Sequence, residues 1–172
     1  MNPIEVRTAA GHDTESLLKM PPYSGGGLTF PFREEILVAE DKGTAVGAVS
    51  VGDKEISPVY GEWNEEFERC LNKFEKITSR MISRLYVLPA YRYRGIGTKL
   101  VEEAVRHVNE KGFNEVYAGI YIGNNFRDIS QHIFEKNGFA KIGSCICFLS
   151  KGYCRGTLLK RTISLSNLEK RK

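Results

Sequence analysis

Apolar residues recur at helical spacing in two long segments of the chain. The first stripe spans residues 61–77 and consists of Trp63, Phe67, Cys70, Leu71, Phe74 and Ile77. The second follows residue 96, ends before Gly112, and consists of Leu100, Val101, Ala104, Val105 and Val108. This period is typical of one face of an amphipathic helix. We therefore predict helices over 61–77 and from about residue 96 to 111, with shorter helices at 13–20, capped by Asp13 or Thr14, and at 127–138.

Short apolar or alternating runs between these segments predict strands. They lie at 4–9, 35–41, 44–53, 81–89, 113–122, 140–151 and 156–165. Lys42 and Gly43 form a tight turn between two of them, and Gly152 marks a second hairpin. The order of elements predicts an α+β fold with a mixed, mostly antiparallel sheet of about six or seven strands. Helices cover both faces, and the central strand-helix-strand unit supplies a parallel pair.

Composition is that of one folded domain. The chain has 172 residues, of which 41% are hydrophobic and 27% charged, and we expect a domain over 1–165 followed by a basic tail at 166–172. No apolar leader and no membrane-length run is present, which favours a cytoplasmic protein without membrane contact. None of the four cysteines forms a CxxC pair, so we expect inert thiols and no metal site.

The net charge of +4 is concentrated near the C-terminus. Residues 151–172 carry seven basic side chains against one acid, Glu169. Such a segment can bind nucleic acid or an acidic partner. The alternative is a solvated strand followed by a frayed end, which we favour.

A glycine loop at residues 92–98, with the sequence RYRGIGT, connects a predicted strand to a predicted helix. Gly95 and Gly97 are poor helix formers, and their position indicates that the backbone approaches a ligand closely. Amides at a helix start bind phosphate, and Arg92, Arg94 and Thr98 add cations and a hydroxyl. The loop therefore predicts a diphosphate site.

Two common nucleotide motifs do not fit the glycine loop. A dinucleotide fingerprint needs a third glycine where Leu100 stands, and a Walker A loop needs Lys before Thr, whereas Thr98 precedes Lys99 here. The segment LYVLPAYRYRGIGTKLVEEAV instead closely resembles the acetyl-CoA-binding motif [RQ]-x-x-G-x-[GA] of the GNAT superfamily of N-acetyltransferases. IFEKNGF, at 133–139, is similar to a later segment of that family.

The resemblance implies transfer of an acetyl group from acetyl-CoA to a primary amine by direct attack in a ternary complex, without a metal. It assigns acetyl-CoA binding to main-chain groups of the glycine loop and of the preceding strand end. The residues expected to bind acetyl-CoA are Tyr86, Val87, Leu88, Arg92, Tyr93, Arg94, Gly95, Ile96, Gly97, Thr98, Asn125 and Phe134. The amides at 86–88 would polarise the thioester carbonyl.

The chain departs from the family at the catalytic positions. The tyrosine expected to protonate the thiolate aligns with Phe134, so that water, Tyr117 or Tyr121 would replace it. The strand at 81–87 lacks the usual glutamate, which leaves Ser83 nearby and Glu62 among several carboxylates that could serve as the base. Arg127 stands where the family tends to have asparagine, and we transfer that role to Asn125.

The acceptor site of such a fold is expected around residues 21–32 and 61–77. The segment 61–77 is an apparent insertion whose acidic face would favour a cationic amine, and its apolar face could instead pack on the core or in a homodimer. Two other functions remain open: an acyl-CoA-binding protein without turnover, and an RNA- or ribosome-associated acetyltransferase.

Overall fold

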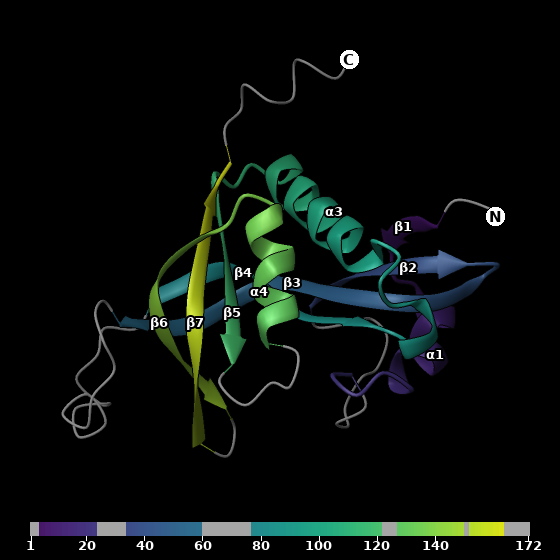
Figure 1. Cartoon of the computed structure of the whole chain (residues 1–172), viewed down its shortest axis with the longest axis horizontal. Coiled ribbons are helices and arrows are strands. Elements are labelled where there is room, and N and C mark those ends of the chain that lie inside the picture. The colour runs from purple at the N-terminus through teal and green to yellow at the C-terminus, as the bar shows by residue number, and fades with distance from the viewer. Residues whose placement is uncertain (1–3, 24–33, 60–76, 122–126, 150–151, 164–172) are drawn as a thin grey trace. The chain divides into compact units, whose positions relative to one another are not determined.

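The computed structural model describes residues 4–23, 34–59, 77–121, 127–149 and 152–163. The elements, shown in Figure 1, are β1 (Glu5–Thr8), η1 (Gly11–Asp13), α1 (Thr14–Leu18), β2 (Glu35–Asp41), β3 (Thr44–Val59), β4 (Ile77–Val87), η3 (Pro89–Tyr91), α3 (Ile96–Glu110), β5 (Glu115–Tyr121), α4 (Arg127–Lys136), β6 (Ala140–Leu149) and β7 (Gly152–Thr162). The seven strands follow the order β1-β2-β3-β4-β5-β7-β6 in one mixed sheet that contains a parallel pair. The predicted fold class is therefore confirmed.

The boundary of the first long helix was predicted wrongly. Ile77 closes the apolar stripe of the predicted helix, but in the structure it is the first residue of β4. The run Ile77–Arg80 contains two β-branched residues, which suit a strand, and the match to the helical stripe is a coincidence of spacing. The rest of that helix, and the basic tail at 166–172, lie outside the described residues. Strand β3 continues to Val59, beyond its predicted end at residue 53.

The chain divides into two compact units, one formed by residues 1–52 and 82–111 and the other by 53–81 and 112–172. In the first unit, one sheet face packs against α1 through a buried cluster of Ala9, Leu17, Met20, Tyr23, Ile36, Val38, Ala45 and Ala48. The amphipathic stripe predicted for α3 is buried along its whole length. Helix α3 contacts β1 and β2, so that it supplies the second apolar layer of this unit.

Gly47 shows how closely α3 approaches the sheet. It pairs with Ala39 across β2 and β3, so both residues share a face opposite to that of Val38. A Cβ atom at Gly47 would lie 3.1 Å from Leu100 Cδ1 of α3 and 3.1 Å from the carbonyl oxygen of Tyr86. The absence of a side chain at this position thus allows β3, the end of β4 and the first turns of α3 to approach one another.

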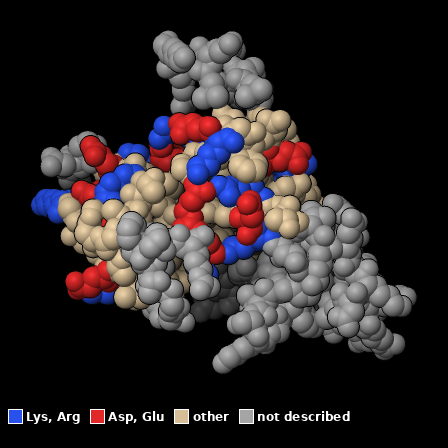
Figure 2. Space-filling model, turned by 180° about the vertical axis from the view of Figure 1, so that it is seen from behind, with Lys and Arg blue, Asp and Glu red and all other residues tan. Residues whose placement is uncertain are grey.

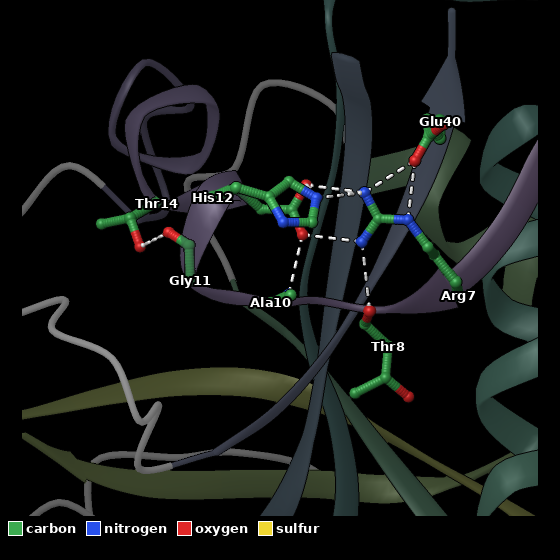
Figure 3. A network of polar contacts seen from close by, with 8 residues as sticks. Arg7, Thr8, Ala10, Gly11, His12, Thr14 and Glu40 are labelled. Carbon is green, nitrogen blue, oxygen red and sulfur yellow. Dashed lines mark hydrogen bonds and ion pairs between the residues drawn. The ribbon is translucent and has the colours of Figure 1, made fainter. Parts of the chain in front are cut away.

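A buried carboxylate joins the start of the chain to the sheet (Figure 3). Asp13 is 2% exposed and accepts hydrogen bonds from two guanidinium nitrogens of Arg7, at 2.7 and 2.9 Å, and from the amide of Ala10 at 2.7 Å. Arg7 also donates to Glu40 at 2.6 Å. Asp13 occupies the N-cap position of α1 without a side-chain cap bond. The predicted position of Asp13 as the cap of α1 is therefore confirmed, but its carboxylate bonds Arg7 and the amide of Ala10 instead of an amide of α1.

The second unit is built on antiparallel hairpin pairing. Strand β7 pairs with β5 from Gly156 to Thr162 and with β6 from Gly152 to Lys160. Residues 56–59 of β3 pair with 144–147 of β6. Phe134 of α4 is buried and its ring meets Phe139 edge-on, with centroids 5.1 Å apart. These two rings fix the C-terminal end of α4 to the start of β6.

Candidate functional site

The glycine loop leaves β4 through a short turn and enters α3 with two residues in the left-handed backbone region. Tyr93 has φ +61° and Gly95 has φ +77°, with Gly95 at the N-cap position of α3. A positive φ is strained for a bulky residue such as Tyr93. Its ring is also 89% exposed, so burial of the side chain does not explain the conformation. The left-handed Gly95 is followed directly by Ile96, the first right-handed residue of α3, and such a pair turns successive backbone amides toward one side, which is the geometry of an anion-binding nest.

The amide groups at the start of α3 point out of the helix. The first helical hydrogen bond runs from the amide of Lys99 to the carbonyl of Gly95, at 3.0 Å. The amides of Ile96, Gly97 and Thr98 therefore precede the helical bonding pattern, at the positive end of the helix dipole. This is the arrangement that binds phosphate oxygens in many proteins.

The space beside Gly95 is open. A Cβ atom built on Gly95 meets no other atom within 4 Å. Steric crowding within the protein therefore does not explain why a glycine stands here; its positive φ does, and so would a ligand that lies against the backbone. The loop thus has the geometry of a phosphate site.

The two arginines of the loop lie against aromatic rings. Arg92 donates from Nε to the carbonyl oxygen of Val87 at 3.0 Å, and its guanidinium lies 5.4 Å from the centre of the Tyr86 ring. Arg94 lies at the same distance from the ring of Tyr91. Arg92 thus ties the loop back to the end of β4, so that its charge is held beside the loop. The sequence predicted the cations but not these contacts.

The loop is also tied to the hairpin turn between β2 and β3. Tyr91 donates its hydroxyl proton to Asp41 Oδ2 at 3.1 Å. This hydrogen bond to a carboxylate raises the pKa of Tyr91. The anchor lies one residue before Arg92, so the start of the glycine loop is held from two directions.

The end of β4 contains the amides predicted to face the thioester. Leu88 donates its amide proton to the carbonyl oxygen of Val46 at 2.9 Å, and the side chains of Tyr86 and Leu88 pack against the core on the α1 side. The Leu88 amide is therefore used by the sheet in this structure. That the amides of Tyr86 and Val87 polarise the thioester carbonyl stays a prediction.

Ser83 lies in β4, three residues before Tyr86. Its Oγ is buried and finds no hydrogen-bond partner among the described residues. Arg84, the next residue, has φ +54° in the middle of the strand. The side chain of Arg84 reaches Glu34, with Nη1 and Oε2 3.6 Å apart. A buried hydroxyl without a partner is costly, and a ligand that reached this part of β4 would satisfy it.

The remaining predicted site residues divide into two groups. Glu62 and Asn125 lie outside the described residues, and of Tyr121 only the backbone, at the end of β5, is described. Phe134 is 4% exposed and packs on Phe139. Tyr117 donates its hydroxyl proton to Glu115 at 3.2 Å, so this alternative proton donor is already engaged on its own strand.

Sequence reasoning missed the contact between Tyr23 and Arg84 of β4. Tyr23, at the end of the described N-terminal segment, donates its hydroxyl proton to the carbonyl oxygen of Arg84 at 2.8 Å. Neither this contact across 61 positions nor the left-handed Arg84 has a local signal, because arginine carries no preference for that conformation. The only hint was the aromatic residue within the glycine- and proline-rich segment at 21–32.

The surface charges do not form a single patch on the face shown in Figure 2, where acidic and basic side chains of the described residues are interspersed. Within the described ranges, no cluster of three or more His, Cys, Asp or Glu side chains could hold a metal ion. In the same part of the chain, no helix is long and apolar enough to cross a membrane.

Comparisons with known proteins agree with this geometry. The family model described as "Acetyltransferase (GNAT) domain" matches residues 32–141, which is more than half of the chain and includes the glycine loop. No curated protein matches the chain significantly in sequence.

Solved structures share the fold at low sequence identity. A ribosomal-protein-alanine N-acetyltransferase from Brucella melitensis is 20% identical with a TM-score of 0.60, covering 92% of this chain and 99% of that one. YncA of Salmonella typhimurium, solved with its cofactor acetyl-CoA, is 16% identical with a TM-score of 0.62 and 95% coverage of both chains. A phosphinothricin acetyltransferase from Sinorhizobium meliloti, in complex with acetyl-CoA, is 20% identical with a TM-score of 0.61, covering 94% of this chain and 89% of that one.

Proposed function

This chain belongs to the GNAT acetyltransferase family, and on that premise we propose that it transfers an acetyl group from acetyl-CoA to a primary amine by direct attack in a ternary complex. The observation that carries the proposal is the junction between β4 and α3. There, a left-handed Gly95 with open space beside it precedes three amides that lie ahead of the first helical hydrogen bond. This junction suits a diphosphate, and the two fold neighbours solved with acetyl-CoA support the choice of ligand.

The glycine loop holds the diphosphate in this proposal. The amides of Ile96, Gly97 and Thr98 donate to phosphate oxygens, and the helix dipole adds to the attraction. Arg92, fixed by its bond to Val87, supplies positive charge beside the loop without having to be ordered on binding. A charge that is already positioned loses less side-chain entropy when the ligand arrives.

The end of β4 orients the thioester. Acetyl-CoA supplies the activated acyl group, whose thiolate leaves readily because thiols are far more acidic than alcohols. The amides of Tyr86 and Val87 donate to the thioester carbonyl and stabilise the negative charge that develops on its oxygen. Donors of this kind contribute about 3–4 kcal/mol when they are preorganised.

Proton transfer is assigned to the catalytic candidates of the sequence. The attacking amine must lose a proton, and Glu62, acting directly or through water, would accept it. Ser83 offers a buried hydroxyl with no partner among the described residues, which would hydrogen-bond the amine or the thioester. Tyr121 would protonate the departing thiolate, since Tyr117 is engaged by Glu115. Asn125 is proposed to bind the pantetheine arm.

A second candidate function is acyl-CoA binding without turnover. It is favoured by Phe134, which has no proton to donate and is buried against Phe139. The third reading, an RNA- or ribosome-associated enzyme, is weakened by two contacts in the basic segment. Lys160 pairs with Glu115 at 2.6 Å, and Arg161 donates to the carbonyl oxygen of Asn137 at 2.5 Å. The cytoplasmic location and a homodimer stay predictions from the sequence.

The proposal is tested by measuring binding and turnover on the same preparation. Acetyl-CoA binding is measured by calorimetry, and release of free CoA thiol is followed with a panel of primary amines. The panel includes peptides with free N-terminal amines, lysine, polyamines, and the two acceptors named for the fold neighbours, ribosomal-protein alanine and phosphinothricin.

Three outcomes separate the functions. Binding with amine-dependent CoA release supports the enzyme, and binding without release for any amine supports the second candidate. Failure to bind acetyl-CoA would contradict both. Salt-sensitive binding to RNA, with an affinity that falls steeply between low and physiological salt, would support the third reading.

A further inference from the structure

The middle of β4 contains backbone strain that a strand does not need. Arg84 has φ +54°, a region that residues with a Cβ atom adopt at a cost. It lies within an eleven-residue strand, Ile77–Val87, two positions before the amides proposed to face the thioester. Strain of this kind persists only where the surroundings enforce it, and it is common at functional sites.

The side chain of Tyr23 supplies that enforcement. Tyr23 is 3% exposed, and its hydroxyl donates to the carbonyl oxygen of Arg84 at 2.8 Å. Ser50, fully buried on β3, donates to the Tyr23 oxygen at 3.3 Å. Burial raises the pKa of Tyr23, so the hydroxyl keeps the proton that it donates. All three residues belong to the same compact unit.

Holding the Arg84 carbonyl also sets the direction of the next amide. The carbonyl of Arg84 and the N–H of Leu85 belong to one planar trans peptide and point in opposite directions. A hydroxyl that fixes the carbonyl therefore fixes the amide as well. It also fixes where β4 resumes its regular course toward Tyr86 and Val87.

We propose that Tyr23 is a positioning residue for acetyl transfer: its hydroxyl fixes the peptide between Arg84 and Leu85 and so aims the following β4 amides at the thioester carbonyl. The inference rests on the proposed function, because it concerns how that carbonyl is polarised. Tyr23 is buried and does not act as an acid or base in this account. Its effect reaches the reaction through the backbone of β4.

The test is Tyr23→Phe, which removes only the hydroxyl. The probe is acetyl-CoA labelled with carbon-13 at the acetyl carbonyl. The stretching frequency of this carbonyl falls when it accepts hydrogen bonds. In the wild-type protein we expect isotope-edited infrared difference spectra to show a lowered frequency for bound acetyl-CoA. In Tyr23→Phe we expect most of that shift to disappear, while the acetyl-CoA dissociation constant from calorimetry changes by less than about threefold, since the glycine loop supplies the affinity.

Two comparisons separate positioning from general loosening of the core. Ser50→Ala removes a hydroxyl from the same buried cluster but leaves the bond from Tyr23 to Arg84 in place, so it should keep the wild-type frequency. Equal loss of the shift in Ser50→Ala would overturn the inference. Where an amine substrate is found, Tyr23→Phe should lower kcat by at least about tenfold with little change in the KM for acetyl-CoA, as expected for an interaction that matters in the transition state.

A glycine background guards against a variant that does not fold. Glycine at position 84 adopts the positive φ without strain. The double variant Tyr23→Phe/Arg84→Gly therefore lacks the backbone strain that could unfold Tyr23→Phe alone. The double variant should lack the frequency shift, and Arg84→Gly alone should keep it. If the frequency is the same with and without the Tyr23 hydroxyl, the inference is wrong although the proposed function stands. If the wild-type protein does not bind acetyl-CoA, the proposed function is wrong and the inference falls with it.

Discussion

Replacing Gly95 by alanine tests whether the start of α3 binds the diphosphate of acetyl-CoA. The helix offers a matched control at its other end. Gly95 precedes α3 with φ +77° and Gly112 follows it with φ +84°, and a Cβ atom on either meets nothing within 4 Å. The helix between them has fifteen residues and is therefore about 22 Å long. The two substitutions impose the same backbone strain at sites that are far apart.

The loss of stability should be the same for both variants. A left-handed residue with a Cβ atom costs about 1–2 kcal/mol, and the more restricted unfolded chain returns about 0.4–1 kcal/mol of that. Open space around both positions means that no steric cost is added. We therefore expect each variant to lose about 1 kcal/mol of unfolding free energy, or about 2–4 °C in Tm for a chain of this size.

Binding should separate the two variants. A phosphate that loses one charge-assisted hydrogen bond to the loop loses about 1.5–3 kcal/mol, which corresponds to a dissociation constant about ten to a hundred times higher. Calorimetry with acetyl-CoA should show this weakening for Gly95→Ala, and less than about a twofold change for Gly112→Ala. Equal affinities in the two variants, at equal stability, would refute the assignment of the phosphate site.

Three further predictions concern the described contacts. Asp13→Asn should lower the unfolding free energy by about 1–2 kcal/mol at neutral pH, because it removes a carboxylate that pairs with a partly exposed guanidinium. Gly47→Ala should cost about 1–3 kcal/mol by overpacking against a backbone carbonyl and α3, which chemical denaturation would measure. Arg92→Lys should weaken acetyl-CoA binding in calorimetry by about three- to tenfold, because lysine cannot keep both the carbonyl bond and the ring contact of arginine.

Each of these has a control or a contrary outcome. Burial acts to raise the pKa of Asp13, but hydrogen bonds from Arg7 and Ala10 and the charge of Arg7 outweigh it and lower that pKa. The stabilisation is therefore present above the unfolded value of about 3.9 and is lost as the pH falls through the folded pKa. A difference in unfolding free energy between wild type and Asp13→Asn that persists at strongly acidic pH would contradict this.

The control for Gly47→Ala is Gly52→Ala, whose Cβ atom meets only Glu34 at 3.4 Å. This variant should change the unfolding free energy little. Arg106→Lys, at an exposed site on α3, should leave acetyl-CoA binding unchanged.

Much of the fold could be predicted because its signals are local. The buried stripe of α3, from Leu100 to Val108, follows directly from amphipathic spacing. The turn at Lys42 and Gly43 adopts positive φ at both residues, as the hairpin signal implies. Ile77 was misplaced because one residue at the end of an apolar stripe fits a helix and a strand equally well. Only its pairing partners distinguish them.

The candidate site could be predicted only in part. The glycine loop has a sequence signature because glycine is the residue that adopts φ +77° without strain. The bond from Leu88 to Val46 depends on how strands meet, which the linear sequence does not state. The partners of Arg92 lie just upstream, but they depend on the path of the turn between β4 and α3. The contact between Tyr23 and Arg84 joins positions far apart in the chain, and neither residue type predicts it.

The left-handed Arg84 also constrains how this protein could be engineered for thermal robustness. Asparagine or glycine would adopt φ +54° more readily than arginine, so a search for stabilising substitutions would select this position early. The same exchange would remove the side chain that reaches Glu34, while the hydroxyl of Tyr23 would still hold the carbonyl oxygen at this position. A library screened for heat resistance should therefore replace the arginine, and a screen for turnover should accept the same variants as long as tyrosine stands at position 23. Stability should thus be gained at this residue without loss of activity, whereas position 23 should tolerate no such exchange.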